Sequence, residues 1–299
     1  MDLTALAGCL ATPACAITQV SSGLIIGIFL FLVASGLSLI FGVLGVINFA
    51  HGAFYMLGAY FAYSGYLATG SFLVAILCGA LGMAVFGAIF ERLFISRIYG
   101  RDILMQLLLC YAFVLILDDL VKIIWGAGYR NMGMPPTFAR PPVFVAGGPI
   151  PVYYLFVIGV AVTVGGALWY VIARTRFGKT VRAAAINPQM VAALGINTPL
   201  LFATVFAIGS LLAGLAGALA APVRTLTPGM GLSILIESFI VTVIGGMGSI
   251  FGAFVAALLI GLTRTLGSIG FPLFVDGVMF TMMALVLVLK PSGLFGREV

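Results

Sequence analysis

The sequence predicts an all-α integral membrane protein, a polytopic bundle of about eight or nine transmembrane helices in a single domain, residues 1–299. Of its 299 residues, 63% are hydrophobic and 7% are charged, whereas a soluble domain carries about 25% charged residues. The chain therefore lacks the charges that a water-exposed surface requires. Its apolar runs are long and contain glycine, which favours helices over barrel strands, where apolar and polar residues alternate.

A membrane-spanning helix needs about 20 apolar residues. Such spans are expected near residues 23–46, 49–68, 71–90, 103–125, 151–173, 199–221, 231–247, 250–266 and 272–290. The first two form one uninterrupted apolar run, as do the seventh and eighth, so eight crossings fit the sequence as well as nine. A first helical half covers 22–125 and a second covers 199–290.

The Lys and Arg residues orient the predicted bundle, because such residues collect in cytosolic loops. Nine of the 14 lie in two loops and near the C-terminus: Arg92, Arg97, Arg101, Arg174, Arg176, Lys179, Arg182, Lys290 and Arg297. Residues 126–150, rich in Pro and Gly, are then an external loop. The N-terminus is expected outside and the C-terminus in the cytosol. These loops account for the net charge of +6, and no binding of nucleic acid is expected.

Two of the four cysteines, Cys9 and Cys15, flank the short stretch LATPA near the N-terminus. In an oxidising external compartment they would pair, and in a reducing one they would stay free. The sequence leaves both states open.

The predicted span 199–221 carries two stripes of small residues at intervals of four. The stripes are Gly209, Ala213, Gly217 and Ala221, and Ser210, Gly214 and Ala218. Small side chains let neighbouring membrane helices approach closely, so that dispersion forces hold them together. We therefore expect this helix near the centre of the bundle.

A weak internal repeat appears when the chain is shifted by 200 residues. IFGVLGVINFAHGAF (40–54) then lies over IVTVIGGMGSIFGAF (240–254), with identical Ile, Val, Gly, Gly, Ala and Phe at matching positions. Transporter folds often contain two related halves, whose Gly-interrupted helices line the solute path at corresponding places. The repeat therefore predicts one interrupted helix in each half.

Polar and glycine residues mark the two predicted interruptions. Asn48 is expected to cap a helix that begins at Phe49, close to His51 and Gly52. In the second half the corresponding residues are Gly245, Gly246, Gly248 and Ser249. Backbone groups freed by such breaks would form a polar spot for a small solute. The alternative is a plain turn at the cytosolic face, with Asn48 and His51 among lipid headgroups, and both remain open.

The acidic residues within predicted spans are expected to have different roles. Glu237 is a candidate for the solute path, because an acid within a span is costly and usually faces the protein interior or a water cavity. Asp118 lies four residues before Lys122, a spacing typical of an ordinary helix ion pair. The single histidine, His51, more often serves to satisfy a buried hydrogen bond than to bind a ligand.

The cytosolic segment 174–198 is expected to form two short helices joined by a turn. TVRAAAI is a helical run, Asn187 offers a cap, Pro188 suits the first helical position, and Gly195 ends the second helix. Its apolar and basic residues suit docking in a groove of a partner. The alternative is an interfacial loop whose basic residues meet anionic lipid.

Four stretches resemble the permease subunits of branched-chain amino acid ABC importers, and in particular the shorter of the two paired permeases. They are GLSLIFGVLGVINFAHGAFYMLGAY (36–60), RTRFGKTVRAAAINPQMVAALGIN (174–197), VIGGMGSIFGA (243–253) and KPSGLFG (290–296). The resemblance implies a multi-pass protein of the bacterial inner membrane. The implied solutes are Leu, Ile and Val, although relatives carry urea, amides or aromatic acids.

The same resemblance implies partners: a second related permease, two cytosolic ATPases and an external solute-binding protein. It also implies that the segment 174–198 is the loop that couples to the ATPases. The residues concerned are Arg176, Phe177, Gly178, Lys179, Arg182, Asn187, Pro188, Leu194 and Gly195.

The chain is expected to have no catalytic residues, no metal site and no cofactor of its own. The P-loop pattern GxxxxGK[ST] does not occur in it, so that ATP and Mg²⁺ would be used by partner subunits. The main rival is a self-sufficient secondary transporter or channel for a small polar solute, which would need an ion-coupling carboxylate such as Glu237. An intramembrane enzyme would need a nucleophile with a base or a metal pair, and the surroundings of His51 supply neither.

Overall fold

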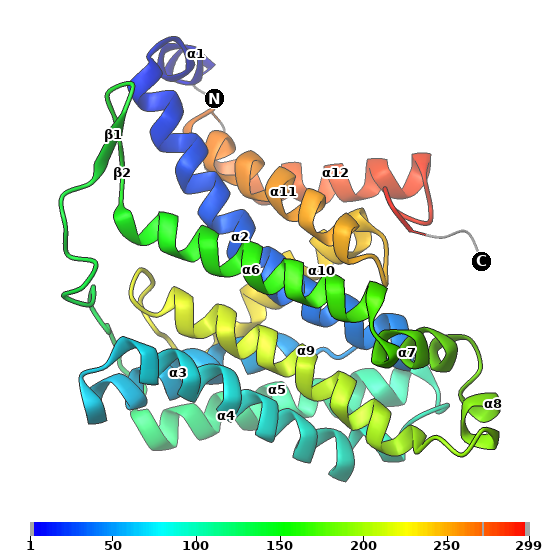
Figure 1. The fold of residues 1–299 in the computed structure, drawn as a ribbon. Helices are drawn as coiled ribbons and strands as arrows, with labels where there is room; N and C mark the ends of the chain where they lie inside the picture. Colours follow the sequence, from blue (N-terminus) through cyan, green and yellow to red (C-terminus); the bar gives the residue numbers. More distant parts are fainter. Residues whose placement is uncertain (1–2, 271, 297–299) are drawn as a thin grey trace.

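A computed structural model describes residues 3–270 and 272–296, and almost all of the regular structure in them is helical (Figure 1). The α-helices are α1 (Leu3–Ala11), α2 (Pro13–Leu44), α3 (His51–Thr69), α4 (Phe72–Leu93), α5 (Ile103–Trp125), α6 (Val152–Arg174), α7 (Arg176–Ile186), α8 (Pro188–Ala193), α9 (Thr198–Ala220), α10 (Met230–Gly245), α11 (Ile250–Gly270) and α12 (Val275–Leu289). Short 3-10 turns cover Ile95–Arg97 and Pro272–Phe274.

Within the described residues, six helical segments are long and apolar enough to cross a membrane. They contain α2, α4, α6, α9, α11 and α12. The polytopic all-α prediction is therefore confirmed. Each of the nine predicted spans has a helix in the structure, α2 to α6 and α9 to α12. Arg297 lies outside the described residues.

The start of the first span was predicted wrongly. The helix α2 begins at Pro13, ten residues before the predicted start at 23. In these added turns the hydroxyls of Thr18 and Ser21 donate to the backbone oxygens of Ala14 and Thr18, at 2.8 and 2.9 Å. Such local bonds satisfy hydroxyl groups inside a helix. Proline at the first helical position fixes φ where no N–H partner is needed.

The segment 126–150, predicted to be a loop, contains a β-hairpin that its sequence did not predict. Strands β1 (Val143–Val145) and β2 (Gly148–Ile150) pair antiparallel around Ala146 and Gly147, which both have positive φ. A two-residue turn of this kind needs left-handed backbone angles, which glycine adopts without strain. The hairpin lies against the first turns of α2, since a Cβ added at Gly148 would meet the carbonyl oxygen of Ala14 at 2.9 Å.

The central position predicted for the helix with small-residue stripes is confirmed. The helix α9 is buried along its second half and packs against α2, α3 and α4. A Cβ added at Gly79 would lie 2.7 Å from the Ala218 side chain, and one added at Gly58 or Gly217 would lie still closer to a neighbouring backbone. Glycine therefore sets the separation of the helices in the core.

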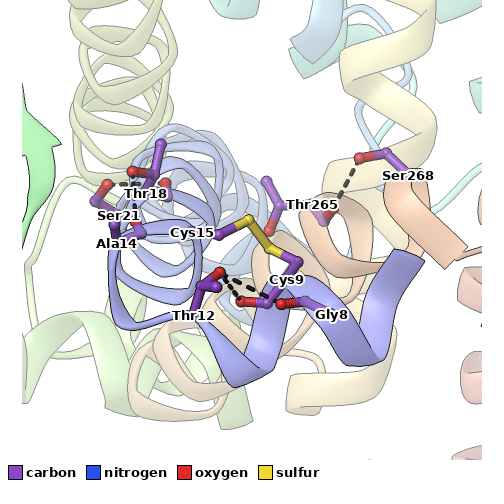
Figure 2. Close-up of a disulfide and its surroundings, with 9 residues drawn as sticks. All are labelled: Gly8, Cys9, Thr12, Ala14, Cys15, Thr18, Ser21, Thr265 and Ser268. Atoms are coloured by element: carbon purple, nitrogen blue, oxygen red, sulfur yellow. Dashed lines mark hydrogen bonds between the residues drawn. A yellow bond between two sulfur atoms is a disulfide. The ribbon is translucent and has the colours of Figure 1, made fainter. Parts of the chain in front are cut away.

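A disulfide joins the end of α1 to the start of α2, so that Cys9 and Cys15 pair in this structure (Figure 2). Thr265 and Ser268 of α11 lie beside it. The disulfide, the β-hairpin and the C-terminal end of α11 gather at one end of the bundle, and α7 and α8 lie at the opposite end (Figure 1).

Candidate functional site

The first predicted interruption is present between α2 and α3. Gly45 ends α2 with φ of 66°, and residues 45–50 are not helical. The predicted cap is wrong, because α3 begins at His51 and its N-cap residue, Ala50, forms no side-chain cap. The Asn48 Oδ1 atom instead accepts from the backbone N–H of Ala50 at 3.1 Å. Asn48 therefore closes a turn over residues 48–50, directly before the first residue of α3.

The interruption turns back into the bundle. Asn48 and His51 are both fully buried, and the Nε2 atom of His51 lies 3.2 Å from the carbonyl oxygen of Val33. Val33 precedes the end of α2 by eleven residues, or about 16 Å along a helix. Gly36 leaves room for the imidazole, since a Cβ there would lie 3.0 Å from Nε2. Burial on this scale excludes the lipid-headgroup alternative for both side chains.

The second interruption lies between α10 and α11 and contacts the last turns of α2, the helix that leads into the first interruption. Gly246 and Gly248 have φ of 99° and 87°. As predicted, Ser249 caps the following helix, because its Oγ accepts from the N–H of Gly252 at 3.0 Å. The N–H of Gly248 donates to Ser38 Oγ of α2 at 3.0 Å. The two matching segments of the repeat therefore each end one helix and begin another.

The second interruption is a surface turn that the C-terminal segment closes. Met247 is 50% exposed. The last carbonyls of α10, at Ile244 and Gly245, accept from the N–H groups of Leu294 and Phe295 at 2.8 and 3.0 Å. These carbonyls thus have partners within the chain, and they are not free for a solute. Gly52 also has a packing role, since a Cβ there would collide with the backbone of Gly231 in α10.

Glu237 forms an ion pair that the sequence analysis missed. Its carboxylate binds the guanidinium of Arg264 in α11, and the two side chains are 8% and 33% exposed. An arginine partner neutralises an acid that would otherwise be costly within a span. No local sequence pattern identifies the pair, because its members lie 27 residues apart on different helices.

Residues 174–198 form the predicted pair of short helices, α7 and α8, which together with Leu194 we call the α7–α8 hairpin (residues 176–194). Asn187 caps α8 by accepting from the N–H of Met190 at 2.9 Å, and Pro188 is the first residue of that helix. Gly195 follows α8 with φ of 81°. Gly178 lies so close to the end of α6 that a Cβ would collide with the carbonyl oxygens of Val171 and Ile172.

The hairpin has a buried face and an exposed tip. On the buried face, Val181, Ala184 and Val191 pack in one apolar cluster with Leu39 of α2 and Leu201 of α9. Phe177 packs against the same cluster, and Arg182 donates to the carbonyl oxygen of Ile172. The tip carries three large apolar side chains, Ile186, Met190 and Leu194, which are 87%, 61% and 74% exposed. Arg176 and Lys179 are exposed in the first half of α7.

A buried acid that the sequence analysis overlooked lies at the same end of the bundle. Glu91 is 1% exposed and accepts a hydrogen bond of 2.5 Å from the Tyr99 hydroxyl. Burial, together with this bond to Glu91, raises the pKa of Tyr99 well above its ordinary value. Tyr99 therefore stays protonated and keeps donating, and its ring packs on Phe202 of α9.

Residues 19–288 match the family model described as branched-chain amino acid transport system / permease component. The chain belongs to this permease family. A high-affinity branched-chain amino acid transport system permease protein of Pseudomonas aeruginosa, BraD, is 30% identical over 292 residues, which are 93% of this chain and 95% of BraD. The permease protein LivH of Escherichia coli K12 is also 30% identical, over 296 residues with the same coverage of each chain.

A shorter match reaches beyond the amino acid permeases. The fructose import permease protein FrcC of Rhizobium meliloti is 34% identical over 101 residues, 31% of this chain and 28% of FrcC. No solved structure matches the chain. The permease family is thus established over almost the whole length by sequence, and the geometry of the α7–α8 hairpin and of the two interruptions comes from this structure.

Proposed function

We propose that this permease is the transmembrane subunit of an ATP-driven importer for branched-chain or related amino acids in a bacterial inner membrane. The family match and the names of BraD and LivH support the solute class. The observation that carries the coupling proposal is the exposed apolar tip of the α7–α8 hairpin. Large apolar side chains gathered on a protruding helix pair are typical of a surface that docks in a groove of a partner.

The proposed assembly has four further subunits outside this chain. A second related permease completes the path through the lipid bilayer, and two cytosolic ATPases bind and hydrolyse ATP with Mg²⁺. A solute-binding protein and its amino acid meet the outer face, where residues 126–150 lie. This orientation puts the N-terminus outside, in keeping with the Cys9–Cys15 disulfide, since disulfides persist in oxidising compartments. The C-terminus is then cytosolic.

The hairpin has a direct mechanical route to the interrupted helices. Force on α7 would pass through Val181 to Leu39 in the last turns of α2. The residue before Leu39, Ser38, accepts a hydrogen bond from the N–H of Gly248. Closure of the ATPases would therefore shift both interruptions together, as a two-state change between packed helices.

The rival proposal, a self-sufficient secondary transporter, is less well supported. It needs a carboxylate that binds and releases a coupling ion within the membrane. The candidate acid, Glu237, is paired with Arg264, which leaves it poorly suited to that role. ATP-driven transport needs no such carboxylate in this chain.

A triple variant in which serine replaces Ile186, Met190 and Leu194 tests the docking proposal. Each large apolar side chain contributes about 1.5–3 kcal/mol when fully buried, so losing even partial burial of three weakens docking about a hundredfold or more. We expect the ATPases to be absent when the triple variant is purified through a tag on the permease. ATP-driven uptake should disappear with them.

The matched control replaces three exposed apolar residues at the opposite end, Val143, Phe144 and Val145, by serine. This variant should keep its ATPases. Stoichiometric ATPase on the hairpin-tip variant would refute the docking proposal.

A further inference from the structure

A cleft opens between α3, α5 and the first turn of α10, which we call the outer cleft. Its volume is about 120 Å³, and it is lined among others by Met56, Tyr111, Leu115, Asp118, Gly229 and Leu232. Asp118 lies seven residues before the end of α5 at Trp125, where the chain leads into the segment 126–150. In the proposed orientation the cleft therefore belongs to the outer half of the membrane.

Asp118 is the charged residue among those that line the outer cleft. Lys122 Nζ lies 2.7 Å from Asp118 Oδ2 and 3.0 Å from Asp119 Oδ1, so one ammonium group serves two carboxylates. The other oxygen of Asp118, Oδ1, is shielded from solvent and has no hydrogen-bond partner among the described residues. A shielded carboxylate oxygen without a donor is costly, and more so within a membrane. A cationic group from outside the chain would remove that cost.

The opposite wall of the cleft is the N-terminus of α10. A Cβ added at Gly229 would lie 3.8 Å from Asp118 Oδ1, and Gly229 has φ of 83°, which favours glycine. The N-terminus of a helix carries a partial positive charge that favours carboxylates. A negative and a partly positive group thus face the same small space, and Met56, Leu115 and Leu232 supply apolar surface beside them. This combination matches the zwitterionic head and aliphatic side chain of a branched-chain amino acid.

We propose that the outer cleft is one wall of the solute site and that Asp118 receives the ammonium group of the amino acid as it enters. This inference rests on the proposed function, since it requires that the solute be an amino acid. Complete small-molecule pockets measure about 300–1,000 Å³, and the outer cleft alone is smaller. The second permease supplies the remaining wall.

The structure offers a matched pair of variants, Asp118→Asn and Asp119→Asn. Both remove one carboxylate next to Lys122, but the Asp119 side chain is 70% exposed and does not line the cleft. In proteoliposomes with the complete transporter, Asp118→Asn should lower the rate of leucine uptake at subsaturating leucine by tenfold or more, because a hydrogen bond to a charged group is lost. Asp119→Asn should stay within about twofold of the unmodified protein, and Asp118→Glu should recover part of the uptake.

Cysteine labelling gives a second readout in the otherwise unmodified protein. A cysteine introduced at Leu232, which is 45% exposed at the cleft, should react with a membrane-impermeant thiol reagent, and leucine should slow this reaction. Equal uptake by the Asp118→Asn and Asp119→Asn variants would overturn the inference and leave the proposed function intact. So would labelling that leucine does not affect. An unmodified transporter without any ATP-driven uptake would overturn the proposed function instead.

Discussion

The predicted role of Glu237 changes once its partner in the structure is known. In the sequence it is an isolated acid within an apolar segment, which is typical of a site for a solute or a coupling ion. In the structure it binds Arg264 on the adjacent helix. Removing one partner of a largely buried ion pair is costly, because the other charge stays behind without compensation.

The substitution Glu237→Gln should therefore lower the free energy of unfolding by about 3 kcal/mol, measured by denaturation in detergent. The double substitution Glu237→Gln with Arg264→Met should recover most of the lost stability, because it removes both charges. It should also preserve ATP-driven uptake. A double variant that is stable but inactive would show that Glu237 acts in transport itself.

The neighbourhood of His51 shows what the sequence could and could not provide at this scale. The position of the interruption was predictable, because Gly45, Asn48 and Gly52 lie together in an apolar run. The direction of the chain after the interruption was not, because it depends on Gly36 and Val33 of the preceding helix. Likewise the partner of Asn48 is a local amide rather than the expected helix end.

Helices were predicted best where the signal is local. The small-residue stripes of α9 repeat every four residues, and the structure puts them against the backbones of α3 and α4. The caps at Asn187 and Ser249 also follow from neighbouring residues. Contacts between distant segments had no local signal, and the closure of α10 by the C-terminal segment 290–296 is the clearest example.

That closure predicts an effect of substituting Gly293. It has φ of 78°, and a Cβ there would lie 2.5 Å from the Cα of Gly246. The substitution Gly293→Ala should therefore break the hydrogen bonds from the N–H groups of Leu294 and Phe295 to the end of α10. Amide hydrogen exchange in residues 290–296 should then become faster. The control is Gly277→Ala in α12, where a Cβ meets nothing within 4 Å. Unchanged exchange in the Gly293→Ala variant would contradict this role of the C-terminal segment.

The whole molecule joins two interrupted helix pairs to one protruding hairpin. The fold class and family were accessible from composition and motifs, and the family model and the relatives BraD and LivH confirm both over more than nine-tenths of the chain. The contact of Ser38 with Gly248, which links α2 to the second interruption, required the structure. Partners, orientation and solute stay predictions.

The central claim is that this permease cannot drive uphill transport alone and is driven by ATPases that bind the α7–α8 hairpin. Uptake of radiolabelled leucine into proteoliposomes tests it most directly, with the permease alone or with both permeases, the ATPases and the binding protein. We predict accumulation above the external concentration only for the complete set with ATP. Accumulation by the permease alone under a proton or sodium gradient would contradict the account.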